Sequence, residues 1–254
     1  GRLVVGGAGL TKAAGTTVAG LAVRDPRTGA WQALATFKTS AGRVATITAL
    51  AVDATRTTLY VAGTFTSITK GSRRVAAVGL AQLNLKTGLW SKVGKGLTGK
   101  GITVRALSLD AESGNLLVAG RFAGSPGVVS ANVAVWSPAR KRWLALGKGV
   151  SAEVATAALA SDGTAYVAGR LSGGLISTWS PTAKVWSTIG DARLFSDLPT
   201  GIVVDSLGHP LIGRGLGWYG EAVQMIEPVA PGGWIPLSGG VSYPRRAAWV
   251  SAMT

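Results

Sequence analysis

The stretch Leu116-Leu117-Val118-Ala119-Gly120 decides the fold, because the same short apolar pattern ending in glycine returns along the whole chain. Its counterparts are Leu3–Gly7, Leu59–Gly63, Ala165–Gly169 and Pro210–Gly213. Segments this short, rich in Val, Leu and Ala and bounded by turn residues, are typical of strands and not of amphipathic helices. Because the pattern returns at intervals of several tens of residues, it indicates a repeat protein.

Each repeat continues with a variable loop, a second apolar strand, a tight turn and a tryptophan that opens a further strand. The turns are built from Asp, Asn, Ser, Pro and Gly, which favour chain reversal. Consecutive tryptophans are 43 to 59 residues apart, the period of a four-stranded propeller blade. Because they recur at one structural place, we expect them to pack between neighbouring blades: Trp31, Trp90, Trp143, Trp186 and Trp234.

A further strand precedes the glycine-ending strand in four of the five repeats, at 47–52, 104–109, 154–159 and 202–204. The first repeat lacks it, but the apolar segment at about 246–252 supplies a matching strand at the other end of the chain. The sequence therefore predicts an all-β fold, a single β-propeller domain of five four-stranded blades whose ring is closed by this C-terminal strand. The expected blades are 1–34 with 246–254, 47–97, 103–150, 153–190 and 201–241.

Composition narrows the possible partners. The chain has 254 residues, of which 47% are hydrophobic and 15% charged, so it can bury a core and does not resemble a disordered protein. Its 26 Lys and Arg against 11 Asp and Glu give a formal net charge of +15, which favours an acidic protein or a polyanion such as sulfated glycan or nucleic acid. There is no cysteine, and no apolar run approaches the roughly 18 residues of a membrane-spanning helix.

In a propeller, the position of a charged residue within its blade predicts the face of the disc on which it lies. Adjacent strands are antiparallel, so the turns after the first and third strands of each blade share one face, which carries charges of both signs. The loops after the second strand and the connections between blades lie on the opposite face, called the basic face below. We assign to it Lys12, Lys70, Arg73, Arg74, Lys95, Lys100, Arg121, Lys148, Arg170 and Arg214.

Two groups on the basic face are candidate binding residues. Arg121, Arg170 and Arg214 directly follow the strand-ending glycine of three successive blades, where guanidiniums could grip carboxylate, sulfate or phosphate groups. The alternative is that they stack on neighbouring blades or are simply solvated. Trp218 and Tyr219 lie in a glycine-rich loop and are candidates for stacking on a sugar or a base.

The sequence offers little for catalysis. Gly94–Gly101 nearly matches a phosphate-binding loop, but Gly101 replaces the Ser or Thr that should follow the lysine, and a strand is expected next instead of a helix. Gly215–Gly220 fits a dinucleotide fingerprint with no helix after it. The single histidine, His209, is expected in a turn, and with one histidine and no cysteine the chain lacks ligands for a zinc or copper site. We therefore expect no enzyme activity, no cofactor and no metal.

The Gly6-Gly7 and Ala-Gly strand ends, followed by an aromatic residue ahead of a tryptophan, as in Trp136 before Trp143, resemble the kelch repeat. The likeness is to divergent kelch-like propellers of cell-surface proteins of the fungal polarity-marker type and of bacterial and algal extracellular proteins. That resemblance implies an interaction module and an extracellular or cell-surface location.

Three hypotheses of function follow. The first is a non-enzymatic binding or scaffold domain whose basic face docks an acidic protein surface or a polyanion. The second is a glycan-binding module that uses Trp218, Tyr219 and the three arginines. The third is a structural component of a larger protein or assembly, without a ligand of its own.

Overall fold

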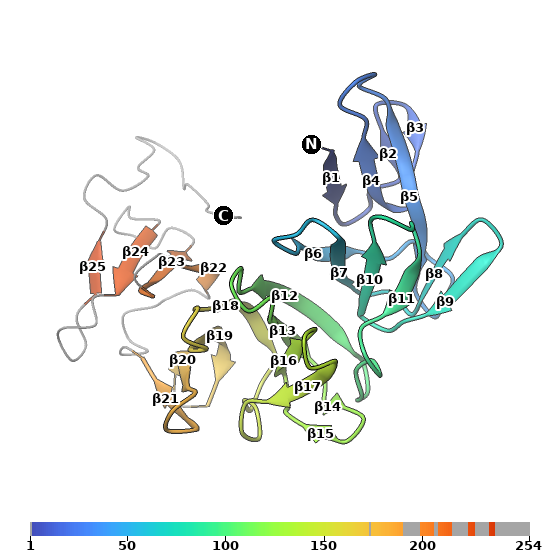
Figure 1. Cartoon of the computed structure of the whole chain (residues 1–254). Coiled ribbons are helices and arrows are strands. Elements are labelled where there is room, and N and C mark those ends of the chain that lie inside the picture. The colour runs from blue at the N-terminus through green and yellow to red at the C-terminus, as the bar shows by residue number, and fades with distance from the viewer. Residues whose placement is uncertain are drawn as a thin grey trace.

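A computed structural model of the chain describes residues 2–172, 174–189, 199–205, 208–214, 223–226 and 234–236. Every regular element in these residues is a β-strand. The strands form successive antiparallel sheets that lie side by side around a common centre, as Figure 1 shows, so the chain has a β-propeller-type repeat fold. No helix in this part of the chain is long and apolar enough to cross a membrane.

Four sheets have four strands each, and their strands follow the order of the chain from the centre outward. We number them blades 2 to 5. Blade 2 consists of β6 (Ile47–Val52), β7 (Thr58–Gly63), β10 (Leu80–Asn84) and β11 (Trp90–Lys92). Blade 3 consists of β12 (Thr103–Leu109), β13 (Leu116–Arg121), β16 (Val133–Ser137) and β17 (Arg142–Ala145). Blade 4 consists of β18 (Val154–Leu159), β19 (Ala165–Leu171), β20 (Gly174–Ser180) and β21 (Val185–Thr188). Blade 5 consists of β22 (Pro199–Val204), β23 (Pro210–Arg214), β24 (Val223–Ile226) and β25 (Trp234–Pro236).

Blade 1 differs from the others. It contains β1 (Leu3–Gly6), β4 (Gly20–Arg24) and β5 (Trp31–Lys38), and a hairpin from the loop of blade 2 joins its outer edge. That hairpin consists of β8 (Ser67–Lys70) and β9 (Arg73–Ala76). Among the described residues no strand pairs with the inner edge of β1. The strand predicted at 246–252 lies outside the described residues, so ring closure stays a prediction.

The length of β5 explains why the hairpin pairs there. β5 has eight residues, against three in β11 and four in β17, and its C-terminal part offers backbone groups along its outer edge. β8 pairs with it from Thr36 opposite Thr69 to Lys38 opposite Ser67. Ile68 is thereby 1% exposed and joins a core cluster with Phe37 and Phe65. Two smaller hairpins lie elsewhere in the loops, β2 (Lys12–Ala13) with β3 (Thr16–Thr17) and β14 (Gly124–Ser125) with β15 (Val128–Val129).

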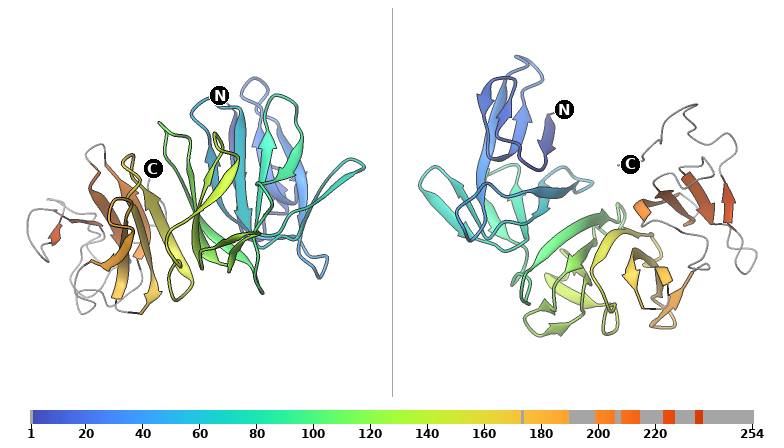
Figure 2. Two further views of the ribbon diagram at one scale, coloured as in Figure 1. Left: turned by 60° about the horizontal axis from the view of Figure 1, so that its bottom comes forward. Right: turned by 180° about the vertical axis from the view of Figure 1, so that it is seen from behind.

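The inner strands β6, β12, β18 and β22 lie next to one another around the centre, which the views of Figure 2 confirm from two further sides. One hydrogen bond between a side-chain hydroxyl and a backbone group joins each neighbouring pair. Thr48 Oγ1 donates to the Val104 carbonyl at 2.5 Å, the Leu159 N–H donates to Ser108 Oγ at 2.9 Å, and the Ile202 N–H donates to Thr156 Oγ1 at 3.2 Å. Neighbouring blades are thus joined by polar contacts at the centre in addition to apolar packing.

The strand-ending glycines have a steric reason. Each inner strand begins with a β-bulge opposite the end of the second strand, which brings backbone atoms close to the glycine. A Cβ on Gly63 would lie 2.2 Å from the Thr46 carbonyl oxygen, and one on Gly120 would lie 2.1 Å from that of Thr103. Gly169 is similarly placed, 2.6 Å from the Glu153 carbonyl oxygen. Only glycine fits this point of blades 2, 3 and 4.

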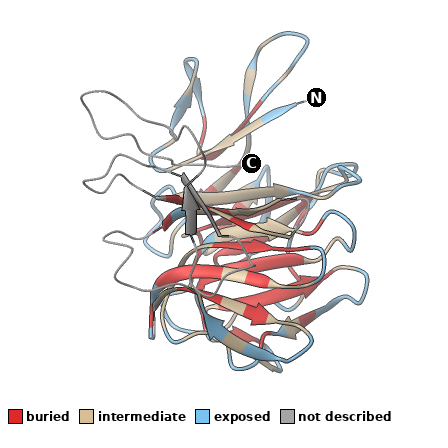
Figure 3. Ribbon diagram, turned by 90° about the vertical axis from the view of Figure 1, so that its left-hand side faces the viewer, coloured by how far each residue is buried: buried red, intermediate tan, exposed pale blue. Residues whose placement is uncertain are grey.

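Buried residues run through the middle strands of the blades, as the red segments of Figure 3 show. The expected packing of tryptophans between blades is confirmed for Trp90 and Trp186. Trp90 packs edge-on against Phe37 of blade 1, with ring centroids 5.2 Å apart. The Trp186 indole N–H of blade 4 donates to the Leu146 carbonyl of blade 3 at 2.8 Å. Trp31 is half-buried, and the side chain of Trp234 lies outside the described part.

Candidate binding face

The acidic side chains of the mixed-charge face stabilise the turns in which they lie. The carboxylate of Asp53 accepts hydrogen bonds from the backbone N–H groups of Thr57 and Thr58 and from the hydroxyls of Thr55 and Thr57. Partial burial acts to raise the pKa of Asp53, but these hydrogen bonds outweigh it and the pKa lies below its usual value. Asp110 and Asp162 likewise accept backbone N–H groups two residues further on. These side chains are therefore structural in the first place.

On the opposite face, Arg121 is not free. Its Nη2 lies 2.5 Å and its Nε 3.1 Å from Oε2 of Glu153, which directly precedes β18 of the next blade. The other carboxylate oxygen of Glu153 accepts a hydrogen bond from Nε of Arg105. Two guanidiniums thus share one carboxylate, and the cluster keeps a surplus positive charge.

The cluster is half open to solvent. The side chains of Arg105 and Arg121 are 49% and 59% exposed, whereas that of Glu153 is 20% exposed. Partial burial acts to raise the pKa of Glu153, but the hydrogen bonds and charges of the two arginines prevail and hold the pKa below its ordinary value. Glu153 is therefore ionised at neutral pH.

Sequence reasoning missed Arg105, and the reason is local. In a regular strand the Arg105 side chain would point to the opposite face of the sheet from those of its two neighbours. However, the pairing of β12 with β13 shifts between Val104 and Ala106. Arg105 occupies this bulge, which turns its side chain toward Glu153. The pattern of residues gives no sign of such a bulge before the pairing of the strands is known.

The three arginines that follow the strand-ending glycines have different surroundings. Arg121 is paired, as described. Arg170, on β19, is exposed, and within the described part of the chain its side chain makes no hydrogen bond or ion pair. Arg214 ends β23, and its side chain lies outside the described residues. Trp218 and Tyr219 also lie outside the described residues, so their stacking role stays a prediction.

Lys70, Arg73 and Arg74 do not lie on the basic face, which corrects the map drawn from the sequence. The β8–β9 hairpin folds back along the outer rim because it pairs with β5 of blade 1. Lys70 Nζ reaches the carbonyl oxygen of Gly88, in the turn before β11, at 3.4 Å. Arg73 and Arg74 are exposed on the outermost strand of that sheet.

Lys95 and Lys148 occupy equivalent places in the connections that follow blades 2 and 3, and both are exposed. The strand expected directly after Gly94–Gly101 is present, since β12 begins at Thr103. A Cβ on Gly94 would lie 2.5 Å from the ring of Trp136, so this glycine allows blade 3 to pack closely on blade 2.

His209 lies in the turn before β23, with Nδ1 3.3 Å from Oδ2 of Asp205. No group of His, Asp and Glu side chains in the described ranges could hold a metal ion.

Comparisons with known proteins concern the fold alone. No protein-family model and no curated protein matches the chain. It is similar in structure to the WD40 repeats of RRP9, at 14% identity over 75% of this chain and 52% of that one, with a TM-score of 0.49. The U3-55K structure matches at 13% identity over 74% of this chain and 52% of that one, with a TM-score of 0.48. An auxiliary nutrient binding protein from Bacteroides thetaiotaomicron matches at 13% identity over 70% and 37%, with a TM-score of 0.47. The chain therefore spans about half the length of the first two structures.

Proposed function

We propose that the chain is a non-enzymatic binding domain whose basic face docks an acidic protein surface or a polyanion. The observation that carries the proposal is the cluster of Arg105, Arg121 and Glu153, in which one carboxylate serves two guanidiniums and leaves a positive charge. Arg170 and Lys148, which are exposed and which the order of strands assigns to the same face, add to it. The field of these groups would attract a negatively charged partner.

We extend the proposal to the whole domain. The five blades form a closed ring in which the segment at 246–252 completes blade 1, with the blade boundaries predicted from the sequence. The repeat is of the kelch-like type, and the domain works at the cell surface or outside the cell as part of a larger protein or assembly. These points rest on the repeat pattern and the resemblance alone.

The test compares two double variants that remove the same charge. Arg170→Ser with Lys148→Ser removes two cations from the basic face, and Arg27→Ser with Lys86→Ser removes two exposed cations from turns of the mixed-charge face. Binding of a heparin-like sulfated glycan, RNA, anionic vesicles and neutral polysaccharide is measured at two salt concentrations. We expect roughly a tenfold loss of affinity for one polyanion in the first variant only, because each lost contact is a charge-assisted one.

Equal losses in the two variants would mean that the charge acts without a defined face. Salt-insensitive binding of neutral polysaccharide would favour the glycan-binding alternative. The absence of binding to every probe at physiological salt would favour a structural component without a ligand of its own.

A further inference from the structure

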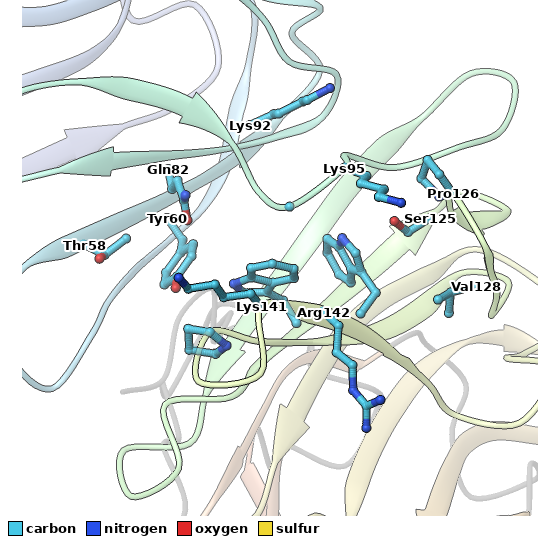
Figure 4. A pocket seen from close by; sticks show the side chains of 14 residues that line it. Thr58, Tyr60, Gln82, Lys92, Lys95, Ser125, Pro126, Val128, Lys141 and Arg142 are labelled. Carbon is cyan, nitrogen blue, oxygen red and sulfur yellow. The ribbon is translucent and has the colours of Figure 1, made fainter.

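A groove with a volume of about 780 Å³ runs along the outer rim between blades 2 and 3. This volume falls within the roughly 300–1,000 Å³ of small-ligand sites. Blade 2 contributes side chains of β7, β10 and β11 and the connection after it, and blade 3 contributes the β14–β15 hairpin and the turn between β16 and β17. The lining residues that matter below, several of which Figure 4 labels, are Gln82, Lys92, Lys95, Ser125, Trp136 and Lys141.

The groove carries positive charge without a compensating carboxylate. Four exposed cations line it, Lys92, Lys95, Lys141 and Arg142, and its described lining includes no Asp or Glu. In Figure 4 the Lys141 side chain extends toward Tyr60 and that of Lys95 toward Ser125. The groove therefore has one ammonium group near Tyr60 and another near Ser125.

The carboxylate near the groove is already engaged. Asp53 lies close enough to Tyr60 that, after burial, its charge is the second cause of the raised pKa of the Tyr60 hydroxyl. Its oxygens, however, accept the hydrogen bonds of the Thr55–Thr58 turn described above. Asp53 forms no ion pair with these lysines in the described part of the chain, and the raised pKa keeps the Tyr60 hydroxyl protonated at neutral pH.

Ser125 is a second, independent sign of a ligand. The residue is 4% exposed and lines the groove, yet its hydroxyl has no hydrogen-bond partner within the described part of the chain. Buried hydroxyls nearly always have a partner, so an unpartnered one beside a cationic groove indicates a missing acceptor or donor. An anionic oxygen of a ligand, bound by Lys95, would be the acceptor for the Ser125 hydroxyl.

The next groove, between blades 3 and 4, has the same construction and a different charge. Its volume is about 800 Å³, and Trp179 packs on Gly147 there as Trp136 packs on Gly94 in the first groove. Lys184 occupies the place of Lys141, and both adopt a left-handed backbone conformation, with φ of 56° and 49°. However, Asp110 and Asp162 line this second groove and Ala145 takes the place of Lys92. The repeat alone therefore does not account for the charge of the first groove.

We propose that the groove between blades 2 and 3 binds an anionic oligosaccharide, a short sugar chain with sulfate or carboxylate groups. Lys95 and Lys141 take the anionic groups, and Ser125 and Gln82 hydrogen-bond to oxygens of the sugar. Trp136 and Pro138 form part of an apolar wall for the ring carbons. This site goes beyond the proposed basic face, because it lies on the rim and shares with that face only Lys95, not Arg121 or Arg170.

The experiment compares Lys141→Asn with Lys184→Asn in the full chain. Asparagine tolerates the left-handed conformation at both places, so the variants are matched in strain and charge. Binding is followed by tryptophan fluorescence, to which Trp136 and Trp143 should respond. The protein is titrated with a sulfated tetrasaccharide, the neutral tetrasaccharide, inorganic sulfate and a hexaglutamate peptide. We expect the sulfated sugar to bind and Lys141→Asn to weaken it about tenfold, with Lys184→Asn unchanged.

Several results would overturn the proposal. These are the absence of binding, equal losses in the two variants, or hexaglutamate or inorganic sulfate binding as tightly as the sulfated sugar. Ser125→Ala adds a readout that a structural role would not give, namely a severalfold loss of affinity with an unchanged Tm. A lower Tm with unchanged affinity would contradict the role of Ser125. The Arg170→Ser, Lys148→Ser variant should keep this binding, so the groove and the basic face can fail separately.

Discussion

Single residues fix how closely the strands of a blade approach one another. Gly63 and Gly169 end the second strands of their blades beside carbonyl oxygens of the following inner-strand segment. Because those oxygens belong to the backbone, a side chain there cannot be accommodated by a change of rotamer. The repeat of glycine in the sequence therefore reflects a repeated steric contact.

We predict that Gly63→Ala lowers the free energy of unfolding by about 2 kcal/mol or more, because its Cβ would meet the Thr46 carbonyl oxygen. Gly127→Ala is the control: its φ is +82°, and no atom lies within 4 Å of the Cβ position. Only the backbone strain of about 1 kcal/mol applies there. Urea unfolding of both variants measures the difference, and equal losses would show that crowding at Gly63 is relieved by local movement.

At the scale of elements, Glu153 connects two blades through side chains of β12 and β13. Its folded-state pKa lies below the ordinary value of 4.5, so its contribution to stability is present above about that pH and is lost as the pH falls through the folded-state pKa. Because the arginines are half exposed, the contribution is under about 1 kcal/mol.

We therefore expect Glu153→Gln to lower Tm at pH 7, and the difference in Tm to shrink as the pH falls through the lowered pKa of the wild-type carboxylate. Thermal unfolding of both proteins between pH 3 and 7 measures this. Other carboxylates with lowered pKa values, such as Asp25 and Asp53, titrate in both proteins and cancel in the comparison. A difference in Tm that does not change with pH would assign Glu153 a role in packing instead of charge.

The elements also show what a sequence can predict. Strand positions, strand-ending glycines and the tryptophans that pack between blades follow from local patterns, and the strands β6, β7, β12, β13 and β18 lie where those patterns place them. The rim position of Lys70 could not be predicted, because it depends on the edge that β5 presents to a distant hairpin. The same holds for Arg105, whose direction depends on a bulge, and for the groove lined by Lys95 and Lys141, which two blades form together.

At the scale of the whole molecule, ring closure can be tested at Gly7. By strand pairing, Gly7 holds the place in blade 1 that Gly63 holds in blade 2, but no described atom lies within 4 Å of its Cβ position. If the segment at 246–252 completes blade 1, Gly7→Ala should cost about as much as Gly63→Ala, roughly 2 kcal/mol. Urea unfolding measures the loss, and a chain shortened after residue 245 should be insensitive to the substitution. No loss in the full chain would contradict closure.

The hydrogen bonds between inner strands have a mechanical consequence. Among the described residues each neighbouring pair of blades from 2 to 5 shares one such bond, so blades 3 and 4 are each bonded in this way to two neighbours. Under a force that pulls the two ends of the chain apart, the proposed closing strand at 246–252 would be released first, and an end blade, which then has only one such neighbour, would follow. The extension of the molecule would then rise in steps of one blade, and blade 3, which bonds to a neighbour on each side, would be among the last to open.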